Sequence, residues 1–187
     1  MDHSTSLAGH FLIAMPGMGD PNFAHGVTLV CQHNEEGAIG LMVNRASRVT
    51  LGEVLEQMNL DCDEPEINGK LVLQGGPVQP ERGFVLHSGE QSWEASYRID
   101  AHWSVTTSRD ILVAVAAGEG PHSAVVALGY AGWGAGQLDQ EIMDNAWLTV
   151  RADNRIVFDT ALEQRWSAAA GLAGIDVSRL AGYAGHA

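Results

Sequence analysis

The sequence predicts a single α/β (α+β) sandwich domain, with mixed, largely antiparallel strands and short helices packed on the sheets. Strand-like segments outnumber helical ones, and hairpins alternate with single helices. Several strands are apolar without interruption, which requires cover on both faces. A length of 187 residues suits one domain. We therefore treat 1–187 as one unit, with an ordered core over about 9–170 and a loose Gly/Ala-rich C-terminal tail.

The first part of the chain predicts a strand and then a hairpin. Residues 11–15 form an apolar run that ends in a loop, 16–22, rich in glycine and proline. β-Branched residues at 27–32 predict a second strand. Residues 34–37 (Asn-Glu-Glu-Gly) have the composition of a turn, and 38–43 is again apolar. The two runs around that turn predict a hairpin buried on both faces.

The rest of the chain alternates short strands with short helices. Further strands are predicted at 71–74, 84–87, 93–99, 103–106, 124–130, 147–150 and 155–158, the last two forming a hairpin around Asp153 and Asn154. Helices are predicted from a Thr50–Glu53 capping box to Met58, from Thr107 or Ser108 to Ala117, around Leu138 and Ile142, and from a second capping box, Thr160–Glu163, through Trp166 and Ala169. The acidic stretch 61–66 predicts a solvated loop.

The charge balance excludes several classes of partner. The formal net charge is −13, from 23 acidic and 10 basic residues, and Lys70 is the sole lysine. Phosphate backbones are held by clustered Lys and Arg, so we expect no direct nucleic-acid binding. The same charge disfavours anionic membranes, and no apolar run approaches the roughly 20 residues of a membrane helix.

Cysteine usage and the N-terminus favour a cytoplasmic protein. Two cysteines, Cys31 and Cys62, are too few for a secreted disulfide scaffold. Residues 1–10 lack the basic and apolar regions of a signal peptide.

Two glycine-rich segments are candidate anion sites, because bare backbone N–H groups can bind phosphate. Gly129, Gly132, Gly134 and Gly136 lie between a predicted strand and a helix, but their spacing does not fit G-x-G-x-x-G. We favour a tight strand-to-helix corner there. The segment 75–78 (Gly-Gly-Pro-Val) is either an anion-binding nest or a sharp turn that brings two strands together, and the turn is favoured.

Cys31 and His33 are two residues apart on a predicted strand and should point to the same face. A neighbouring imidazolium can lower the pKa of a thiol, and Cys-x-His, with His25 on the same parity, can begin a metal site. The sequence offers no second pair of zinc ligands. A small core cysteine is the favoured interpretation, and a redox-responsive thiol at Cys31 is the alternative.

No motif indicates catalysis. The acidic run 61–66 does not fit a calcium loop, because Pro65 and Ile67 occupy ligand positions. There is no H-E-x-x-H and no G-x-S-x-G. Ser108, beside Arg109 and Asp110, is interpreted as a helix cap. We therefore expect no enzyme activity, no cofactor and no metal.

Trp133 and Trp147 could anchor a partner in a shallow groove, because large aromatics beside bare backbone often do so. For each taken alone, core packing is the favoured role.

Ten sequence blocks, in order, give the chain a close resemblance to a known family. They are 11–16 (FLIAMP), 20–23 (DPNF), 40–45 (GLMVNR), 75–78 (GGPV), 82–87 (RGFVLH), 107–110 (TSRD), 128–133 (LGYAGW), 136–138 (GQL), Glu141 and 145–148 (NAWL). The chain resembles the bacterial YqgE/AlgH family from about Gly9 to Trp166. The resemblance implies a cytosolic α/β sandwich, and one member carries the label of a transcriptional regulator of exopolysaccharide and virulence genes. No catalytic residues are established for the family, so none are transferred.

A chain this acidic without a helix-turn-helix pattern should not read an operator directly. We therefore expect a regulatory or adaptor protein that binds an unknown protein partner in an apolar groove, with a monomer as the favoured state. The residues expected to frame that groove are Met15, Pro16, Asp20, Phe23, Asn44, Gly75, Gly76, Pro77, Tyr130, Trp133, Gln137 and Trp147. The alternative is a small-anion or nucleotide-binding protein, or an unrecognised enzyme, that uses the glycine-rich turns.

Overall fold

The computed structural model describes residues 5–14, 25–89 and 92–175. Its strands are β1 (His10–Ala14), β2 (Val27–Asn34), β3 (Gly37–Met42), β4 (Ala46–Thr50), β5 (Leu71–Gln74), β6 (Val78–His87), β7 (Ser96–Arg98), β8 (Ser104–Thr106), β9 (Ala124–Trp133) and β10 (Trp147–Arg151). Its helices are α1 (Leu51–Gln57), α2 (Pro65–Asn68), α3 (Arg109–Ala116), α4 (Gln137–Met143), α5 (Asn154–Phe158) and α6 (Arg165–Leu172), with a 3-10 turn η1 (Leu162–Gln164) before α6.

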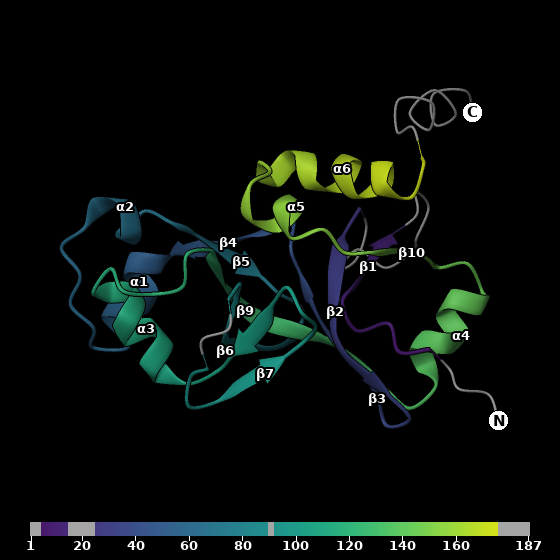
Figure 1. The fold of residues 1–187 in the computed structure, drawn as a ribbon, viewed down its shortest axis with the longest axis horizontal. Helices are drawn as coiled ribbons and strands as arrows, with labels where there is room; N and C mark the ends of the chain where they lie inside the picture. Colours follow the sequence, from purple (N-terminus) through teal and green to yellow (C-terminus); the bar gives the residue numbers. More distant parts are fainter. Residues whose placement is uncertain (1–4, 15–24, 90–91, 176–187) are drawn as a thin grey trace.

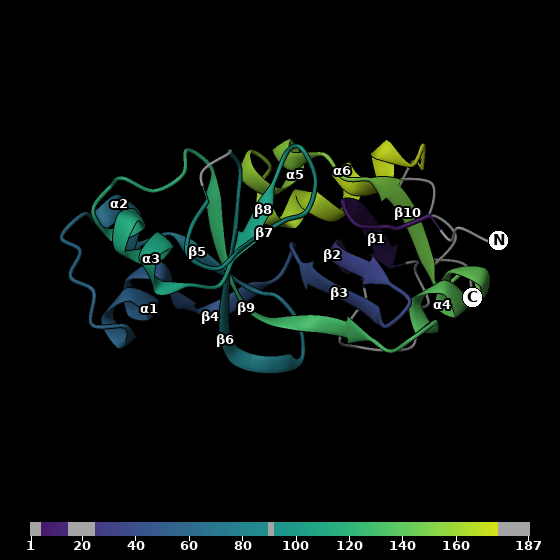
Figure 2. The same cartoon turned by 60° about the horizontal axis from the view of Figure 1, so that its bottom comes forward.

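Strand β9 belongs to two half-sheets (Figures 1 and 2). Its end pairs with β3 in half-sheet A, whose order is β10-β1-β2-β3-β9. Its start pairs with β6 and β5 in half-sheet B, whose order is β4-β5-β9-β6-β8-β7. All described pairings are antiparallel except β5 with β9. The predicted mixed, largely antiparallel α+β fold is confirmed.

The two half-sheets meet at a backbone crossing of three glycines. Gly129 has a φ of +76°, and a Cβ there would overlap the carbonyl oxygen of Gly76. A Cβ on Gly75 would overlap the carbonyl oxygen of Gly129. The Gly75 N–H donates to the Leu128 carbonyl at 2.7 Å, and the Gly75 carbonyl accepts from the Met42 N–H at 2.7 Å. The backbone of Gly75 therefore joins β9 to β3. A side chain at Gly75 or Gly129 would prevent this close approach of the two backbones.

The segment 75–78 is a structural turn, as favoured. In the other segment only Gly134 and Gly136 lie at the expected strand-to-helix corner, because Gly129 and Gly132 are inside β9.

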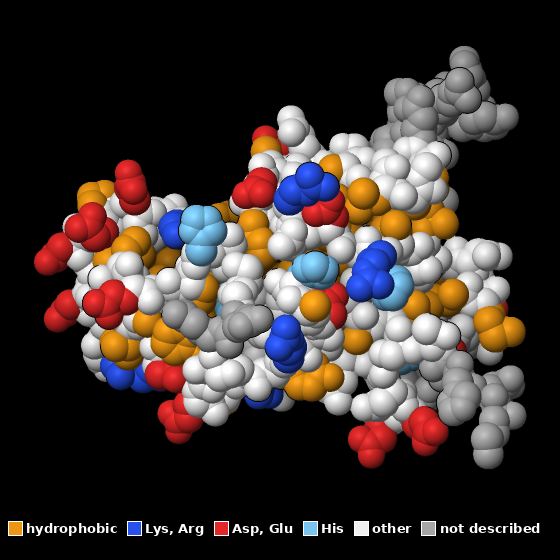
Figure 3. Space-filling view, viewed as in Figure 1, with side chains coloured by type: hydrophobic (Ala, Val, Ile, Leu, Met, Phe, Trp, Pro, Cys, Tyr) orange, Lys and Arg blue, Asp and Glu red, His pale blue; other side chains and the backbone are white. Residues whose placement is uncertain are grey.

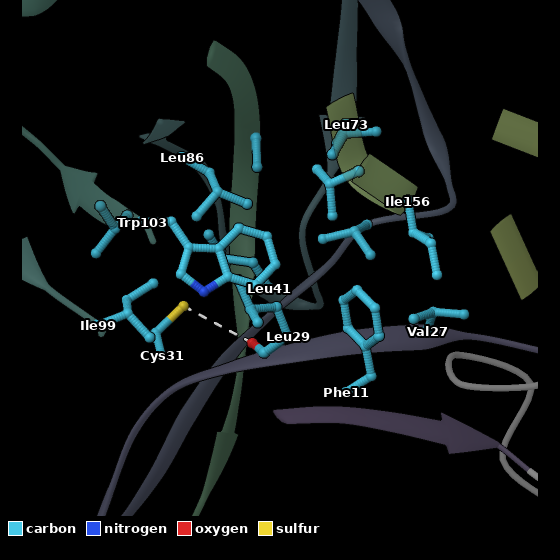
Figure 4. Close-up of a cluster of buried hydrophobic side chains, with 14 of the residues drawn as sticks. Phe11, Val27, Leu29, Cys31, Leu41, Leu73, Leu86, Ile99, Trp103 and Ile156 are labelled. Atoms are coloured by element: carbon cyan, nitrogen blue, oxygen red, sulfur yellow. Dashed lines mark hydrogen bonds between the residues drawn. The ribbon is translucent and has the colours of Figure 1, made fainter. Parts of the chain in front are cut away.

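Apolar side chains fill the space between the half-sheets (Figure 4). Trp103 is 2% exposed and makes edge-to-face ring contacts with Phe11 and Phe158, at 6.2 and 6.3 Å between centroids. Helices α5 and α6 close this core with Ile156 and Ala169. The other face of half-sheet A packs against α4, and half-sheet B packs against α1 and α3. The fold is thus layered, as a sandwich requires.

Several predicted elements are confirmed with close to their expected bounds. The Thr50–Glu53 capping box is formed: the Glu53 N–H donates to the Thr50 hydroxyl at 3.3 Å, and the Glu53 carboxylate accepts from the Thr50 N–H at 2.8 Å. The hairpin of β2 and β3 turns at 34–37, and Gly37 has a φ of +137°. Local hydrogen-bonding rules suffice for these elements.

Two predictions near the C-terminus are wrong. Residues 155–158 form α5 rather than a hairpin strand, because the Asp153 carboxylate accepts from the Arg155 N–H at 3.0 Å and so caps a helix. Thr160 does not begin a capping box, because its hydroxyl donates to the Arg155 carbonyl at 3.2 Å. The chain instead makes η1, and α6 begins at Arg165.

Other boundaries also differ from the prediction. The loop expected over 61–66 ends in α2, which Pro65 begins at the first helical position, where proline is favoured. Strand β4, whose side chains are exposed or half-buried, was not predicted. Strand β7 is shorter than expected, and β9 continues to Trp133.

The crossing predicts that alanine substitution lowers stability more at Gly129 than at Gly136, although the two glycines have similar φ. Gly136 has a φ of +72° and open space around it, so Gly136→Ala should cost only the strain of a left-handed residue, about 1 to 2 kcal/mol. Gly129→Ala adds a backbone overlap and should cost more than about 4 kcal/mol. Urea unfolding of both variants checks this. Equal costs would show that the crossing accommodates a side chain.

Candidate functional site

The structure distributes the residues expected to frame a groove over several places. Met15, Pro16, Asp20 and Phe23 lie outside the described residues. The Asn44 side chain fastens the beginning of β2, since it donates to the His25 carbonyl at 2.8 Å and accepts from the Val27 N–H at 2.9 Å.

Three more of these residues lie at or beside the crossing. Gly75 and Gly76 form it, and Pro77 is exposed next to it.

Trp133 and Trp147 pack against each other under α4. They are 7% and 4% exposed, and their rings meet edge to face with centroids 6.2 Å apart. Leu138 of α4 packs in the same cluster. The Gln137 side chain accepts from the Gly134 N–H at 2.9 Å and so supports the beginning of α4. The favoured core role of both tryptophans is confirmed.

A hollow lies where the β2–β3 hairpin meets the end of β9. We call it the Ile39 groove; it has a volume of about 370 Å³. Its lining includes Gln32, Glu36, Ile39, Tyr130, Gly132 and Trp133. Two predicted groove residues, Tyr130 and Trp133, are thus brought together here.

Ile39 is the apolar centre of this groove. It pairs with Gln32 on β2 and with Gly132 on β9, so it lies in a row across three strands. Its side chain is 38% exposed, although it belongs to an apolar run predicted to be buried on both faces. Gly132 has no side chain, so nothing on β9 covers Ile39 at this point of the row. Ile39 is therefore a large apolar side chain left uncovered by the described residues.

The groove lies beside an open strand edge. Residues 131–133 of β9 pair with β3 on one side. On the other side β6 pairs with β9 only as far as Tyr130, opposite Val78. Among residues 5–14, 25–89 and 92–175, no strand continues that pairing. An open edge presents backbone N–H and carbonyl groups that can pair with another chain.

The surroundings of the groove are acidic. Glu35 and Glu36 are exposed at the hairpin turn.

His33 holds the hairpin on its other face. The His33 Nε2 lies 3.3 Å from the Asp139 carboxylate of α4, and the His33 Nδ1 accepts a hydrogen bond from the Leu7 N–H at 3.1 Å. These contacts anchor the hairpin to α4.

Cys31 is a core residue. It is 4% exposed, and its Sγ lies 3.7 Å from the Leu29 carbonyl oxygen (Figure 4). Burial raises the pKa of the thiol to about 12. This confirms the favoured interpretation and removes the basis for a reactive thiolate.

The prediction that Cys31 and His33 share a face is wrong. A bulge between Val30 and Gln32 interrupts the alternation of β2. Cys31 therefore packs in the main core, whereas His33 contacts Leu7 and Asp139 beside α4. His25 lies elsewhere, with its ring 5.0 Å from that of Trp166.

A buried hydrogen-bonded chain joins three strands of half-sheet B. The His87 Nδ1–H donates to the Ser88 carbonyl at 3.1 Å, and Nε2 accepts from the Thr106 hydroxyl at 2.7 Å. That hydroxyl in turn accepts from Ser96 at 2.7 Å. Because His87 is fully buried, desolvation lowers its pKa below the ordinary value of 6.5. Both ring nitrogens of this neutral imidazole are therefore occupied by hydrogen bonds within the fold.

The described part of the chain contains neither a cluster suited to metal binding nor a membrane-crossing helix. No three His, Cys, Asp or Glu side chains there lie close enough together to hold a metal ion. None of its helices has the length and hydropathy needed to cross a bilayer.

A family model described as AlgH-like matches residues 11–178. The chain belongs to the AlgH-like family. Relatives named UPF0301 proteins share 54% identity in Xanthomonas campestris and 53% in Xanthomonas oryzae, over 98% of this chain and 97% of theirs.

Two solved structures support the family fold. AlgH from Pseudomonas aeruginosa, solved in solution, has 48% identity and a TM-score of 0.82 over 100% of this chain and 99% of that one. A crystal structure of a Corynebacterium diphtheriae protein has a TM-score of 0.62 at 23% identity, over 82% of this chain and 78% of that one. The second likeness shows the fold alone.

Cys31 and Cys62 should differ sharply in reactivity. In the folded protein at pH 8, iodoacetamide should label half-buried Cys62 and leave Cys31 unmodified, since its thiol stays protonated and enclosed. Both should be labelled in urea. Peptide mass spectrometry measures the two sites, and labelling of native Cys31 at the rate of a free thiol would contradict this account.

His87 should make stability depend on pH. Its folded pKa is lowered, so below about pH 6.5 the unfolded chain binds the additional proton. The free energy of unfolding should therefore fall as pH decreases from 7 toward the folded pKa, by up to about 1.4 kcal/mol per pH unit. His87→Gln should reduce this slope, whereas His102→Gln, at an exposed site, should keep it. Identical slopes in both variants, from urea titrations, would exclude His87 as the source.

Proposed function

We propose that this protein is a non-enzymatic regulatory adaptor that binds a partner protein in the Ile39 groove. The observation that carries the proposal is the exposure of Ile39 in the middle of a three-stranded surface. An apolar run inside a sheet is ordinarily covered. A partner that covers Ile39 completes the burial that the sequence pattern predicts.

The partner presents an extended segment. In the described part of the chain no strand pairs with β9 beyond Tyr130 on its β6 side, so a strand can be added there by backbone hydrogen bonds, and the neighbouring groove can receive one of its side chains. Ile39 and Tyr130 favour an apolar side chain there. Glu35 and Glu36 favour Lys or Arg in the flanking residues of the segment, by charge complementarity.

Adaptor action also agrees with the charge of the chain. A net charge of −13 opposes direct contact with a phosphate backbone. The regulatory role that the family resemblance implies would therefore operate through a protein partner. The alternative anion site at the glycine turns is weakened, because the Gly75 N–H already donates to Leu128 and the crossing brings the glycine backbones into contact.

The proposal is tested with a displayed library of random peptides selected on the full chain. Wild-type protein should enrich segments with a central apolar residue flanked by Lys or Arg. Ile39→Arg should weaken the binding of the selected peptides by at least about tenfold, or 1.4 kcal/mol, because it places a longer, positively charged side chain in the groove. Fluorescence anisotropy measures the dissociation constants.

Val113→Arg is the matched control. Val113 is 43% exposed on α3, which packs on half-sheet B, so the same substitution there should leave peptide binding unchanged. Thermal unfolding should show that both variants are folded. If the selected peptides bind Ile39→Arg as tightly as wild type, the groove is not the binding site.

A further inference from the structure

A second groove brings basic side chains together in this acidic chain. It has a volume of about 360 Å³ and lies between the start of β5, the start of β9 and the junction of α5 with α6. Lys70, His122 and Arg165 line it, together with Leu71, Phe158 and Asp159. It shares no lining residue with the Ile39 groove.

Arg165 is the most deeply placed of these basic side chains. The side chain is buried, with only 7% of the residue exposed. Its Nε donates to the Thr160 carbonyl at 3.0 Å and its Nη1 to the Val43 carbonyl at 2.6 Å. These bonds fix the guanidinium plane between α6 and the end of β3.

Among the described residues, no counter-ion is in contact with the charge of Arg165. Within the described ranges, no carboxylate lies within 4.0 Å of its guanidinium, and Nη2 donates to no described residue. Burial lowers its pKa, and the more distant Glu163 raises it in part. Guanidinium nevertheless stays protonated in proteins, so a buried positive charge remains. Such a charge is unfavourable unless an anion approaches it.

The other two basic side chains come from separate segments. Lys70 is held at the α2–β5 junction, where its N–H donates to the Ile67 carbonyl at 3.1 Å and its carbonyl accepts from the Leu51 N–H at 3.0 Å. His122 lies just before β9. The carbonyl of its neighbour Ser123 accepts a hydrogen bond from the Ser88 N–H at 3.0 Å. Basic side chains from three separate segments thus line one groove. The single acidic lining residue is Asp159, which also interacts electrostatically with Arg155.

We propose that this groove binds the phosphate group of a small phosphorylated metabolite. A planar guanidinium, an ammonium and an imidazole line the same groove, and such nitrogen donors suit an anion with several oxygens. Exposed Leu71 and half-buried Phe158 offer an apolar wall for the body of the ligand. The volume matches small-molecule pockets. Acidic and basic side chains are both scattered over the surface (Figure 3), and the net charge of −13 repels polyanions such as nucleic acid, which favours small ligands.

The test is a titration of the full chain with phenyl phosphate, followed by amide chemical shifts. Wild-type protein should show saturable shifts confined to residues 70–71, 122–125 and 157–159. Lys70→Glu should weaken binding at least about tenfold, equivalent to 1.4 kcal/mol. Arg151→Glu makes the same charge change on exposed β10, outside the groove, and should change binding less than about twofold.

Two outcomes would overturn the proposal. One is the absence of saturable shifts in the groove with phenyl phosphate. The other is an equal loss of affinity in Lys70→Glu and Arg151→Glu, which would indicate only a general charge effect. Ile39→Arg should bind phenyl phosphate like wild type, so failure of the adaptor proposal and failure of this one are distinguishable.

Discussion

Close backbone contact between Gly75, Gly76 and Gly129 is the constraint on which the rest of the structure depends. It allows one strand, β9, to leave half-sheet B and enter half-sheet A without interruption. The Gly75 peptide hydrogen-bonds to both β9 and β3 at that point. As a result the half-sheets face each other across a common core, and the two proposed grooves lie at opposite ends of β9.

Sequence reasoning succeeded where the deciding interactions are local. The Thr50–Glu53 capping box and the β2–β3 turn depend on residues three or four positions apart. It failed where two local signals compete. The segment after Asp153 has strand-like residues, but the cap contact from Asp153 to Arg155 makes it helical. The acidic charge of 61–66 led to the prediction of a loop, whereas Pro65 begins α2 at the first helical position.

The candidate sites could be predicted only in part, because they depend on contacts distant in sequence. Tyr130 and Trp133, two of the residues expected to frame a groove, line the Ile39 groove. Ile39 was expected to be buried, and only the strand order shows that β9 becomes an edge beside it. Arg165 reaches Val43, which is 122 positions away in the sequence. One bulge in β2 was enough to separate Cys31 from His33, and period-two alternation cannot reveal it.

The central claim is that the glycine crossing makes the two half-sheets one cooperative unit. Native-state hydrogen exchange in rising urea tests it most directly. Amides of Leu12 and Leu29 in half-sheet A, and of Val72 and Val85 in half-sheet B, should converge on one opening free energy equal to that of global unfolding. If one half-sheet opened at a free energy lower by about 2 kcal/mol or more, the halves would be separable and the claim would be contradicted.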